Sequence, residues 1–227
     1  MKLKEILVFG ASGQIGRHLI RKLTKNNYKV VAVTRNIHQK GYILKTQANP
    51  GYLEIVELTY FNIEKIKSLV EECSICINLI GILFEKKKNF FKNIHTDFPD
   101  LLSKLSAKKN IEKLIHLSSL GIEKSLDSNY AISKLEGENK IKNNFDRVVV
   151  LKPSIVYSVD DNFTTNFMTL LNRLPIMPIY YEGKTKFAPI HVTDLAQIIF
   201  DVVQGKTNEQ TIECIGPEII SFKEIIL

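Results

Sequence analysis

The stretch Gly10-Ala11-Ser12-Gly13-Gln14-Ile15-Gly16 follows directly on the apolar run Ile6-Leu7-Val8-Phe9. Four consecutive apolar residues are typical of a strand that is buried on both faces, as in a parallel sheet. After the glycines, apolar residues return with helical spacing as far as Leu23. A buried strand, a glycine-rich turn and a helix in this order indicate a βα unit that binds a dinucleotide.

Each glycine of this motif has a physical role in such a unit. The first permits a tight turn, the second lets the backbone approach a pyrophosphate, and the third lets the helix pack close to the strand. The helix N-terminus adds N–H groups and a positive dipole end. Glycines also serve ordinary βα turns, but here the motif opens the first unit and a second strand, Val30-Val31-Ala32-Val33, follows. We therefore expect cofactor contacts from Gly10, Ser12, Gly13, Gln14, Ile15 and Gly16.

Length and hydropathy point to a globular chain. The 227 residues are 44% hydrophobic, which is ample for a core. No apolar run approaches the ~20 residues of a membrane span. Because Met-Lys-Leu-Lys-Glu leads directly into the first strand, we expect no signal peptide. These features predict a cytoplasmic protein, with peripheral contact at the inner membrane as the alternative.

The net charge of +7 comes from lysines that are scattered along the chain. Nucleic-acid binding would favour basic residues clustered on one face, so we expect no nucleic-acid partner. The exception is Lys86-Lys87-Lys88, which lies beside Phe84, Phe90 and Phe91. This run fits either an anionic membrane or acidic partner, or a solvated loop, and short charge runs are usually solvated.

The three cysteines do not indicate a redox or metal site. Cys73 and Cys76 form one C-x-x-C, but Cys76 begins an apolar strand, whereas a redox pair would lie at a helix N-terminus. A zinc site would need a second pair or histidines at ligand spacing, and the five histidines are dispersed. We expect buried or half-buried thiols and no metal.

Strand-like and helix-like segments alternate through the first two thirds of the chain. A helix capped by Asn62, a long helical region over about 89–108 that Pro99 starts or kinks, and a helix over about 129–144 connect the strands. Six strands with helical crossovers predict an α/β fold with a doubly wound parallel sheet, the Rossmann architecture. The expected strands are 6–9, 30–34, 53–57, 75–80, 113–117 and 148–152.

Beyond Pro153 the pattern changes. We expect a dinucleotide-binding domain over 1–153 and a small substrate-side lobe over 154–227, interleaved with the last Rossmann elements. The apolar end of the chain suggests that this lobe is truncated. Expected elements are a helix from Asp160-Asp161-Asn162 to about 173, a short strand at 190–192, a helix over 195–203 capped by Asp194, a strand at 210–215, and a helix opened by the capping box of Ser221 and Glu224.

A second chemical signature is Tyr130-Ala-Ile-Ser-Lys134, which lies on the helix expected at 129–144. The four-residue spacing places Tyr130 and Lys134 on one face, one turn apart. A nearby ammonium favours phenolate, so Lys134 is expected to lower the Tyr130 pKa toward neutrality for acid–base work. Ser118 and Ser119 end the strand before it, and one of them can hold a substrate oxygen because adjacent strand residues point to opposite faces.

The glycine pattern, Ser118-Ser119 and the Tyr130/Lys134 pair together resemble the extended or atypical short-chain dehydrogenase/reductase family, including its epimerase/dehydratase-like members. The resemblance continues through Lys152-Pro153-Ser154-Ile155-Val156-Tyr157 and Ile190-His191-Val192-Thr193-Asp194, so it covers nearly the whole chain. Three further segments resemble the dinucleotide-binding accessory subunits of respiratory complex I and their bacterial relatives: Asn78-Leu-Ile-Gly-Ile-Leu-Phe-Glu85, His116-Leu-Ser-Ser-Leu-Gly121 and Asp160-Asp-Asn-Phe163.

The end of the second strand favours NADP(H) over NAD(H). NAD-binding folds place an acid about 20 residues past the glycines, on the ribose 2′-OH. Here the strand ends Thr34-Arg35-Asn36, and Arg35 is placed to bind a 2′-phosphate. Members of the family carry an acid after the third strand that reaches the adenine amine, and in this chain Thr59 takes that position.

Three functions stay open. One is an accessory or assembly protein of a respiratory or other complex, in which NADP(H) is structural. The second is an active oxidoreductase, epimerase or dehydratase that acts on a sugar nucleotide or small carbonyl substrate with Tyr130, Lys134 and Ser118 or Ser119. The third is a regulatory, redox-sensing reductase-like domain without catalysis. The resemblance implies that Leu79, Gly81 and Pro153 line the cofactor together with Tyr130 and Lys134.

Overall fold

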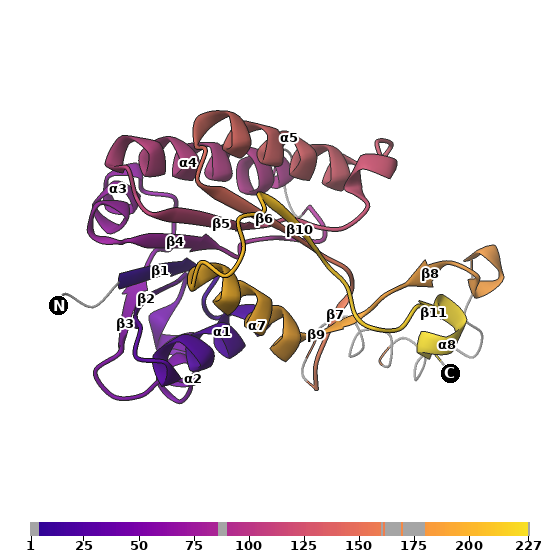
Figure 1. Ribbon diagram of the computed structural model, residues 1–227, viewed down its shortest axis with the longest axis horizontal. Helices are drawn as coiled ribbons and strands as arrows, with labels where there is room; N and C mark the ends of the chain where they lie inside the picture. Colours follow the sequence, from indigo (N-terminus) through magenta and orange to yellow (C-terminus); the bar gives the residue numbers. More distant parts are fainter. Residues whose placement is uncertain (1–4, 86–89, 160, 162–168, 170–179, 227) are drawn as a thin grey trace.

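The centre of the protein is a seven-stranded sheet in which every neighbouring pair is parallel (Figure 1). The computed structural model describes residues 5–85, 90–159, 161, 169 and 180–226. The strand order is β10-β6-β5-β4-β1-β2-β3. The strands are β1 (Glu5–Phe9), β2 (Lys29–Thr34), β3 (Leu53–Glu57), β4 (Ile75–Asn78), β5 (Lys113–Leu117), β6 (Val148–Pro153) and β10 (Thr211–Cys214).

Strand β1 lies where the winding of the sheet reverses. It pairs with β2 on one side and with β4 on the other. Residues 6–9 are completely buried, as expected for a strand covered on both faces. A crevice at the carboxyl ends of the strands beside such a reversal is where open α/β sheets bind ligands. The doubly wound parallel sheet is therefore confirmed, and the glycine motif lies at its reversal point.

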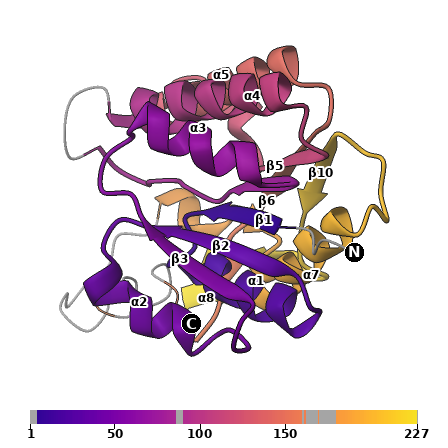
Figure 2. The same cartoon turned by 90° about the vertical axis from the view of Figure 1, so that its left-hand side faces the viewer.

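Helices cover both faces of this sheet (Figures 1 and 2). One face carries α3, α4 and α5, and the other carries α1, α2 and α7. Alternate residues of β1 feed the two cores: Ile6 and Val8 lie in one cluster, Leu7 and Phe9 in the other. The helices are α1 (Gln14–Lys25), α2 (Ile37–Lys45), α3 (Ile63–Glu72), α4 (Phe98–Lys109), α5 (Asn129–Asn144) and α7 (Val192–Val203).

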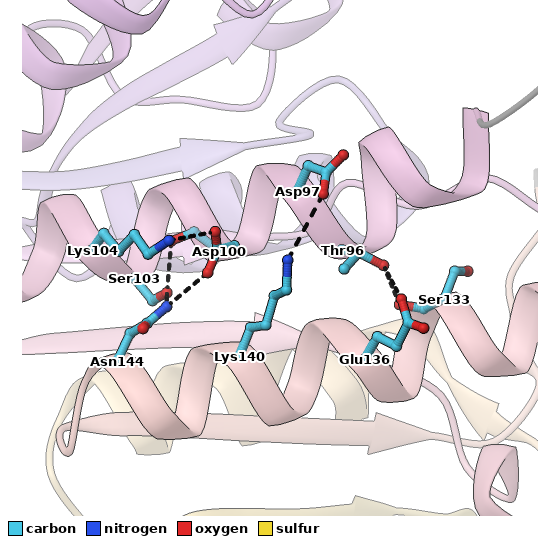
Figure 3. A network of polar contacts seen from close by, with 9 residues as sticks. All are labelled: Thr96, Asp97, Asp100, Ser103, Lys104, Ser133, Glu136, Lys140 and Asn144. Carbon is cyan, nitrogen blue, oxygen red and sulfur yellow. Dashed lines mark hydrogen bonds and ion pairs between the residues drawn. The ribbon is translucent and has the colours of Figure 1, made fainter.

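Polar contacts tie α4 to α5 on the outer surface (Figure 3). The Asn144 amide donates to Asp100 at 2.9 Å, and Lys104 pairs with the same carboxylate at 2.8 Å. Just before α4, the chain forms the π-helical turn η1 (Lys92–Asp97), from which Thr96 donates to the Ser133 carbonyl at 2.9 Å. Pro99 lies at the start of α4, as expected.

The last part of the chain first adds a strand to the sheet and then extends away from it. Helix α7 packs against α1, and β10 pairs with β6 as a seventh strand. The 3-10 turn η3 (Tyr180–Gly183), β8 (Lys186–Phe187), β11 (Ile220–Ser221) and α8 (Phe222–Ile226) lie beyond the sheet (Figure 1). A further small pair joins β7 (Val156–Tyr157) to β9 (Ile190–His191).

The helix caps and element bounds agree with the sequence-based predictions at some positions and differ at others. The caps by Asn62 and by the Ser221–Glu224 box are confirmed, since both accept the expected backbone N–H bonds. Helix α7 begins earlier than predicted, and His191 rather than Asp194 caps it, because its ring accepts from the Thr193 N–H. Strand β4 ends at Asn78 instead of residue 80. The expected helix at 160–173 and the Lys86-Lys87-Lys88 run lie outside the described residues.

Candidate functional site

The glycine turn after β1 can be built only with glycine at two of its positions. Gly10 has a φ of +76°, and a Cβ there would lie 2.9 Å from the Leu79 carbonyl carbon. A Cβ on Gly16 would lie 2.6 Å from the Gly10 carbonyl oxygen and closer still to that of Ala11. The first glycine therefore allows the turn, and the third allows α1 to pack on it.

The N-terminus of α1 presents its backbone without any acidic neighbour. Gly13, whose carbonyl accepts from the Arg17 N–H, is the N-cap, and it has no side chain that could occupy the first-turn N–H groups. The first turn contains no Asp or Glu. Such a helix end attracts an anion through its N–H groups and its dipole, so this turn fits a pyrophosphate.

The other side chains of the motif support the turn from its two sides. Ser12 accepts a hydrogen bond from Thr34 at the end of β2, at 3.3 Å. The Gln14 amide donates to Ser158 at 2.9 Å, which links α1 to the segment after β7. Ile15 packs against the core on the α1 side of the sheet.

The end of β2 carries a basic side chain and no acid. Arg35 is exposed, and its carbonyl accepts from the Thr59 hydroxyl at 3.4 Å. The nearby Glu57 carboxylate already accepts from the Ile37 N–H at the start of α2, at 3.1 Å. Arg35, which directly follows β2, thus provides a positively charged guanidinium at the carboxyl edge of the sheet.

Tyr130 and Lys134 of α5 meet the carboxyl ends of β4 and β5. The Lys134 Nζ is buried, donates to the Leu117 carbonyl at 3.1 Å, and lies 6.0 Å from the centre of the Tyr130 ring. A Cβ on Gly81 would lie 3.5 Å from the same Nζ. The sequence-predicted residues Gly81, Tyr130 and Lys134 are therefore brought together.

The two serines after β5 point to different partners. Ser119 forms a hydrogen bond with Tyr130. Ser118 is buried and donates to the Glu138 carboxylate. The geometry therefore brings Ser119, and not Ser118, to the tyrosine.

The remaining predicted contacts lie along the same edge. Leu79 donates its N–H to the Phe9 carbonyl at 3.0 Å, so it lies directly beside the glycine turn. Pro153 ends β6, and its carbonyl accepts from the Leu120 N–H at 3.0 Å. The line from Arg35 through Gly10 and Leu79 to Tyr130 follows the carboxyl ends of β2, β1, β4 and β5.

The expected lowering of the Tyr130 pKa is not what the structure gives. Burial raises the pKa of Tyr130, and the hydrogen bond from Ser119 opposes this only in part. Burial also lowers the pKa of Lys134 to about 8, against the attraction of Glu138. The reason is that Lys134 donates to a backbone carbonyl and lies 6.0 Å from the centre of the Tyr130 ring, so the burial of the phenol outweighs its charge.

A buried ion pair beneath α5 was not predicted from the sequence. The Lys152 Nζ lies 3.0 Å from the Glu138 carboxylate and also contacts Glu123. Glu138 follows Lys134 by four residues and thus lies on the same face of α5, which is the signal that could have revealed it. Together with Ser118, this pair joins α5 to the ends of β5 and β6.

Two buried histidines near Lys134 were also missed. The Asn78 amide contacts the His116 Nδ1 at 3.1 Å, while His95 lies in η1 against the Tyr130 ring. Burial is the first cause, and Lys134 the second, of a His95 pKa lowered to about 3. The same causes hold the pKa of His116 well below its usual value. Dispersed histidines carry no spacing signal, so only the fold could bring them together.

The cysteines are buried thiols, as predicted. Cys73, Cys76 and Cys214 are free and buried. Burial raises the pKa of Cys73 to about 12, which makes it a poor nucleophile.

Sequence comparison identifies the family. The model of the NAD dependent epimerase/dehydratase family matches residues 6–214. The chain belongs to this family. The match runs from β1 to β10, so it covers the whole sheet and every predicted site residue.

The relatives carry the names of different functions. The mitochondrial NADH-ubiquinone oxidoreductase 40 kDa subunit of Neurospora crassa is 25% identical over 219 residues, which is 96% of this chain and 57% of that protein. The ceramide reductase of Caulobacter vibrioides is 24% identical over 193 residues, or 84% of this chain and 58% of that protein. The chain thus spans less than two thirds of the length of these relatives.

Solved structures share the fold. The UDP-glucose 4-epimerase of Thermotoga maritima superposes with a TM-score of 0.78 at 17% identity, over 98% of this chain and 80% of that one. Within the described part of the chain, no helix has the length and apolar character needed to cross a membrane.

Proposed function

We propose that this member of the epimerase/dehydratase family binds NADP(H) and keeps it as a structural element of a respiratory or other protein complex. The observation that carries the binding is the glycine turn, where Gly10 and Gly16 have no room for a side chain and α1 offers an anion site. The pyrophosphate would lie on this turn, and Arg35 would hold the 2′-phosphate with its fork of donors.

Two observations support a structural role for the cofactor. The relative from Neurospora crassa is named as a subunit of NADH-ubiquinone oxidoreductase and matches 96% of this chain. In addition, burial raises the pKa of Tyr130, so the phenol is not poised to lose its proton at neutral pH. A subunit of this kind would associate peripherally with the inner membrane through its complex.

Calorimetric titration tests the cofactor and its preference. We expect NADPH to bind more tightly than NADH, and Arg35→Ala to remove most of that preference, because a charge-assisted pair with a phosphate contributes about 1.5–3 kcal/mol. Arg21→Ala, an exposed arginine on α1, is the matched control and should change nothing. Equal affinity of the wild-type protein for the two cofactors would exclude NADP selectivity, and no affinity for either would exclude the function.

A specific contact favours a second candidate function, that of an active oxidoreductase, epimerase or dehydratase. Ser119 is hydrogen-bonded to Tyr130, and this pair could hold a substrate oxygen and its proton beside the buried Lys134. A bound nicotinamide would supply hydride transfer in such a site. The ceramide reductase among the relatives carries a name of this type.

The Tyr130→Phe variant separates the two candidates. If the chain is an enzyme, this variant should lose nearly all turnover of NADPH with carbonyl substrates while its cofactor affinity stays within about twofold. If the cofactor is structural, the wild-type protein retains bound nucleotide through purification and shows no turnover above that of the variant.

A further inference from the structure

His95 is the central residue of a buried bridge between two parts of the candidate site. Its Nε2 accepts a hydrogen bond from the Ile82 N–H at 3.1 Å. Its Nδ1 lies 3.0 Å from the Ser133 hydroxyl, one residue before Lys134. Ile82 lies in the loop that follows β4, and Ser133 belongs to α5, so one ring joins the two segments.

The hydrogen bonds in this bridge all point in one direction, so that each group donates to the next. A backbone N–H can only donate, so the Nε2 of His95 must be unprotonated and accept this hydrogen bond from Ile82. In the neutral ring the proton is then on Nδ1, which donates to Ser133. The Ser133 hydroxyl in turn donates to the Tyr130 carbonyl at 2.8 Å. The chain of bonds from Ile82 to Tyr130 is complete only with the neutral Nδ1–H tautomer.

Ring contacts add to the polar ones. The His95 ring meets the Tyr130 ring edge to face, with 5.3 Å between the ring centres. It also stacks with Phe91, at 5.3 Å between the ring centres and with 18° between the planes, and Phe91 in turn contacts the Tyr130 ring. His95 is 1% exposed, so the ring is enclosed on all sides. Its position therefore determines how the Tyr130 ring lies.

The backbone holds His95 in place as well. It lies in the π-helical turn η1, and such turns are frequent at functional sites. A Cβ on Gly137 would overlap the His95 carbonyl, so α5 approaches η1 as closely as glycine allows. Near this point Thr96 donates to the Ser133 carbonyl, as Figure 3 shows. The chain at His95 and Thr96 is thus packed closely against α5.

The loop that His95 anchors lies between the two halves of the candidate site. At its start, Leu79 is in contact with the glycine turn, where a Cβ on Gly10 would meet it. In its middle, Gly81 is next to the Lys134 Nζ. Directly after Gly81 is Ile82, which donates its N–H to His95. The spacing between the pyrophosphate turn and the Tyr130/Lys134 pair therefore depends on this loop.

We propose that His95 is a positioning residue of the dinucleotide site, which locks the 79–82 loop onto α5 and so sets the shape of the nicotinamide end. This proposal rests on the proposed binding function. His95 does not touch the reacting atoms, because both ring nitrogens are engaged within the protein. Its loss should weaken binding of the nicotinamide half and leave the adenosine half unchanged.

The test compares a whole cofactor with a fragment by titration calorimetry. In His95→Phe, which keeps a ring but removes both hydrogen bonds, NADPH affinity should fall about tenfold, the size expected for one or two lost bonds. Affinity for 2′,5′-ADP, which lacks the nicotinamide, should stay within about twofold. His38→Phe makes the same change at an exposed site on α2 and should alter neither.

If His95→Phe folds poorly, a second variant and an NMR measurement on the wild-type protein test the proposal, and if it folds, hydrogen exchange adds a third test. Ser133→Ala deletes the Nδ1 bond and the bond from Ser133 to the Tyr130 carbonyl but keeps the bond from Ile82. It should shift the NADPH to 2′,5′-ADP affinity ratio in the same direction. Nitrogen-15 NMR of the wild-type protein should show the neutral Nδ1–H tautomer for His95. Hydrogen exchange of the Ile82 amide should accelerate in His95→Phe, while that of Ile77 in β4 should not.

The outcomes separate the proposal from the function on which it rests. A wild-type protein that binds neither NADPH nor NADH overturns the proposed function and this proposal together. A wild-type protein that binds NADPH, with an unchanged affinity ratio in His95→Phe and Ser133→Ala, overturns the role of His95 alone. An Nε2–H tautomer would also overturn it, because the bond from Ile82 could not then exist.

Discussion

At the scale of single residues, the site is distinguished by basic groups whose pKa values burial lowers. His95 and His116 lie close to Lys134, and desolvation is the main cause of the lowered pKa of all three. Protonating either histidine would place a second cation in a region with little solvent to screen it. Both rings are therefore neutral in the folded protein at neutral pH.

This neutrality predicts a loss of stability in mild acid. Histidine has a pKa near 6.5 in the unfolded chain and a lower one here, so the unfolded state binds more protons below pH 6.5. The free energy of unfolding should fall by about 1.2 kcal/mol for each buried histidine between pH 6 and pH 5, or about 2.4 for the two. Urea titrations at several pH values measure this slope.

Variants assign that slope to the buried rings. His95→Gln and His116→Gln should each remove about half of it, because glutamine does not titrate. His38→Gln, at an exposed position, should leave the slope as it is in the wild-type protein. A slope that survives both buried substitutions would mean that the histidines ionise freely in the folded state.

At the scale of the element, α5 is held by what lies beneath it. Its bounds were predicted from the sequence, and the structure confirms a helix over Asn129–Asn144. The partners of its inner face were not predicted: Glu138 receives Ser118 from the end of β5 and Lys152 from β6. These contacts fix the rotation of the helix and therefore the positions of Tyr130 and Lys134.

Removing one partner of the buried Glu138–Lys152 pair should lower the free energy of unfolding substantially. Glu138→Ala leaves Lys152 buried beside only the partly exposed Glu123, and removing one partner of a buried pair costs about 3–5 kcal/mol. The double variant Glu138→Leu/Lys152→Met should recover much of this loss, since apolar residues can replace a buried pair. Urea unfolding of the single and double variants measures the difference.

The exposed pair on α4 is the matched control for this experiment. Lys104 lies at the surface and pairs with Asp100 four residues earlier. Lys104→Ala should cost no more than about 0.5 kcal/mol, because water screens such pairs. If Glu138→Ala cost as little as this, the buried pair would not be what holds α5.

At the scale of the whole molecule, a late segment of the chain supplies the last strand of the sheet. Strand β10 adds to the edge of β6, and α7 covers α1, although both follow the segment that departs from the Rossmann pattern. In contrast, α8 and β11 make their main contacts with β8 and η3. The core therefore depends on residues 190–214 and much less on those beyond.

Shortened chains test this division. A chain that ends after Gly216 keeps β10 and α7, so its free energy of unfolding should remain within about 1 kcal/mol of the full chain, as for changes away from a core. A chain that ends after Pro189 lacks both, which exposes the β6 edge and the apolar face of α1, and it should aggregate. Urea unfolding and light scattering distinguish these results, and equal stability of the two short chains would contradict the assignment.

The sequence by itself determined the parallel sheet and the glycine turn, because both depend on local signals. Residues 6–9 are apolar without interruption, and Gly10 and Gly16 are placed where their neighbours leave no space for a Cβ. The spacing of Tyr130 and Lys134 likewise follows from helical geometry. Such signals involve residues that are close together in the chain.

Only the tertiary structure decided which groups surround the tyrosine. It brought Ser119 to Tyr130 and turned Ser118 to Glu138, and it placed His95 beneath the loop at Ile82. It also reversed the expected direction of the Tyr130 pKa, because burial outweighs a lysine that is itself desolvated. Desolvation and long-range contacts depend on how distant segments pack, and no local pattern in the sequence records that packing.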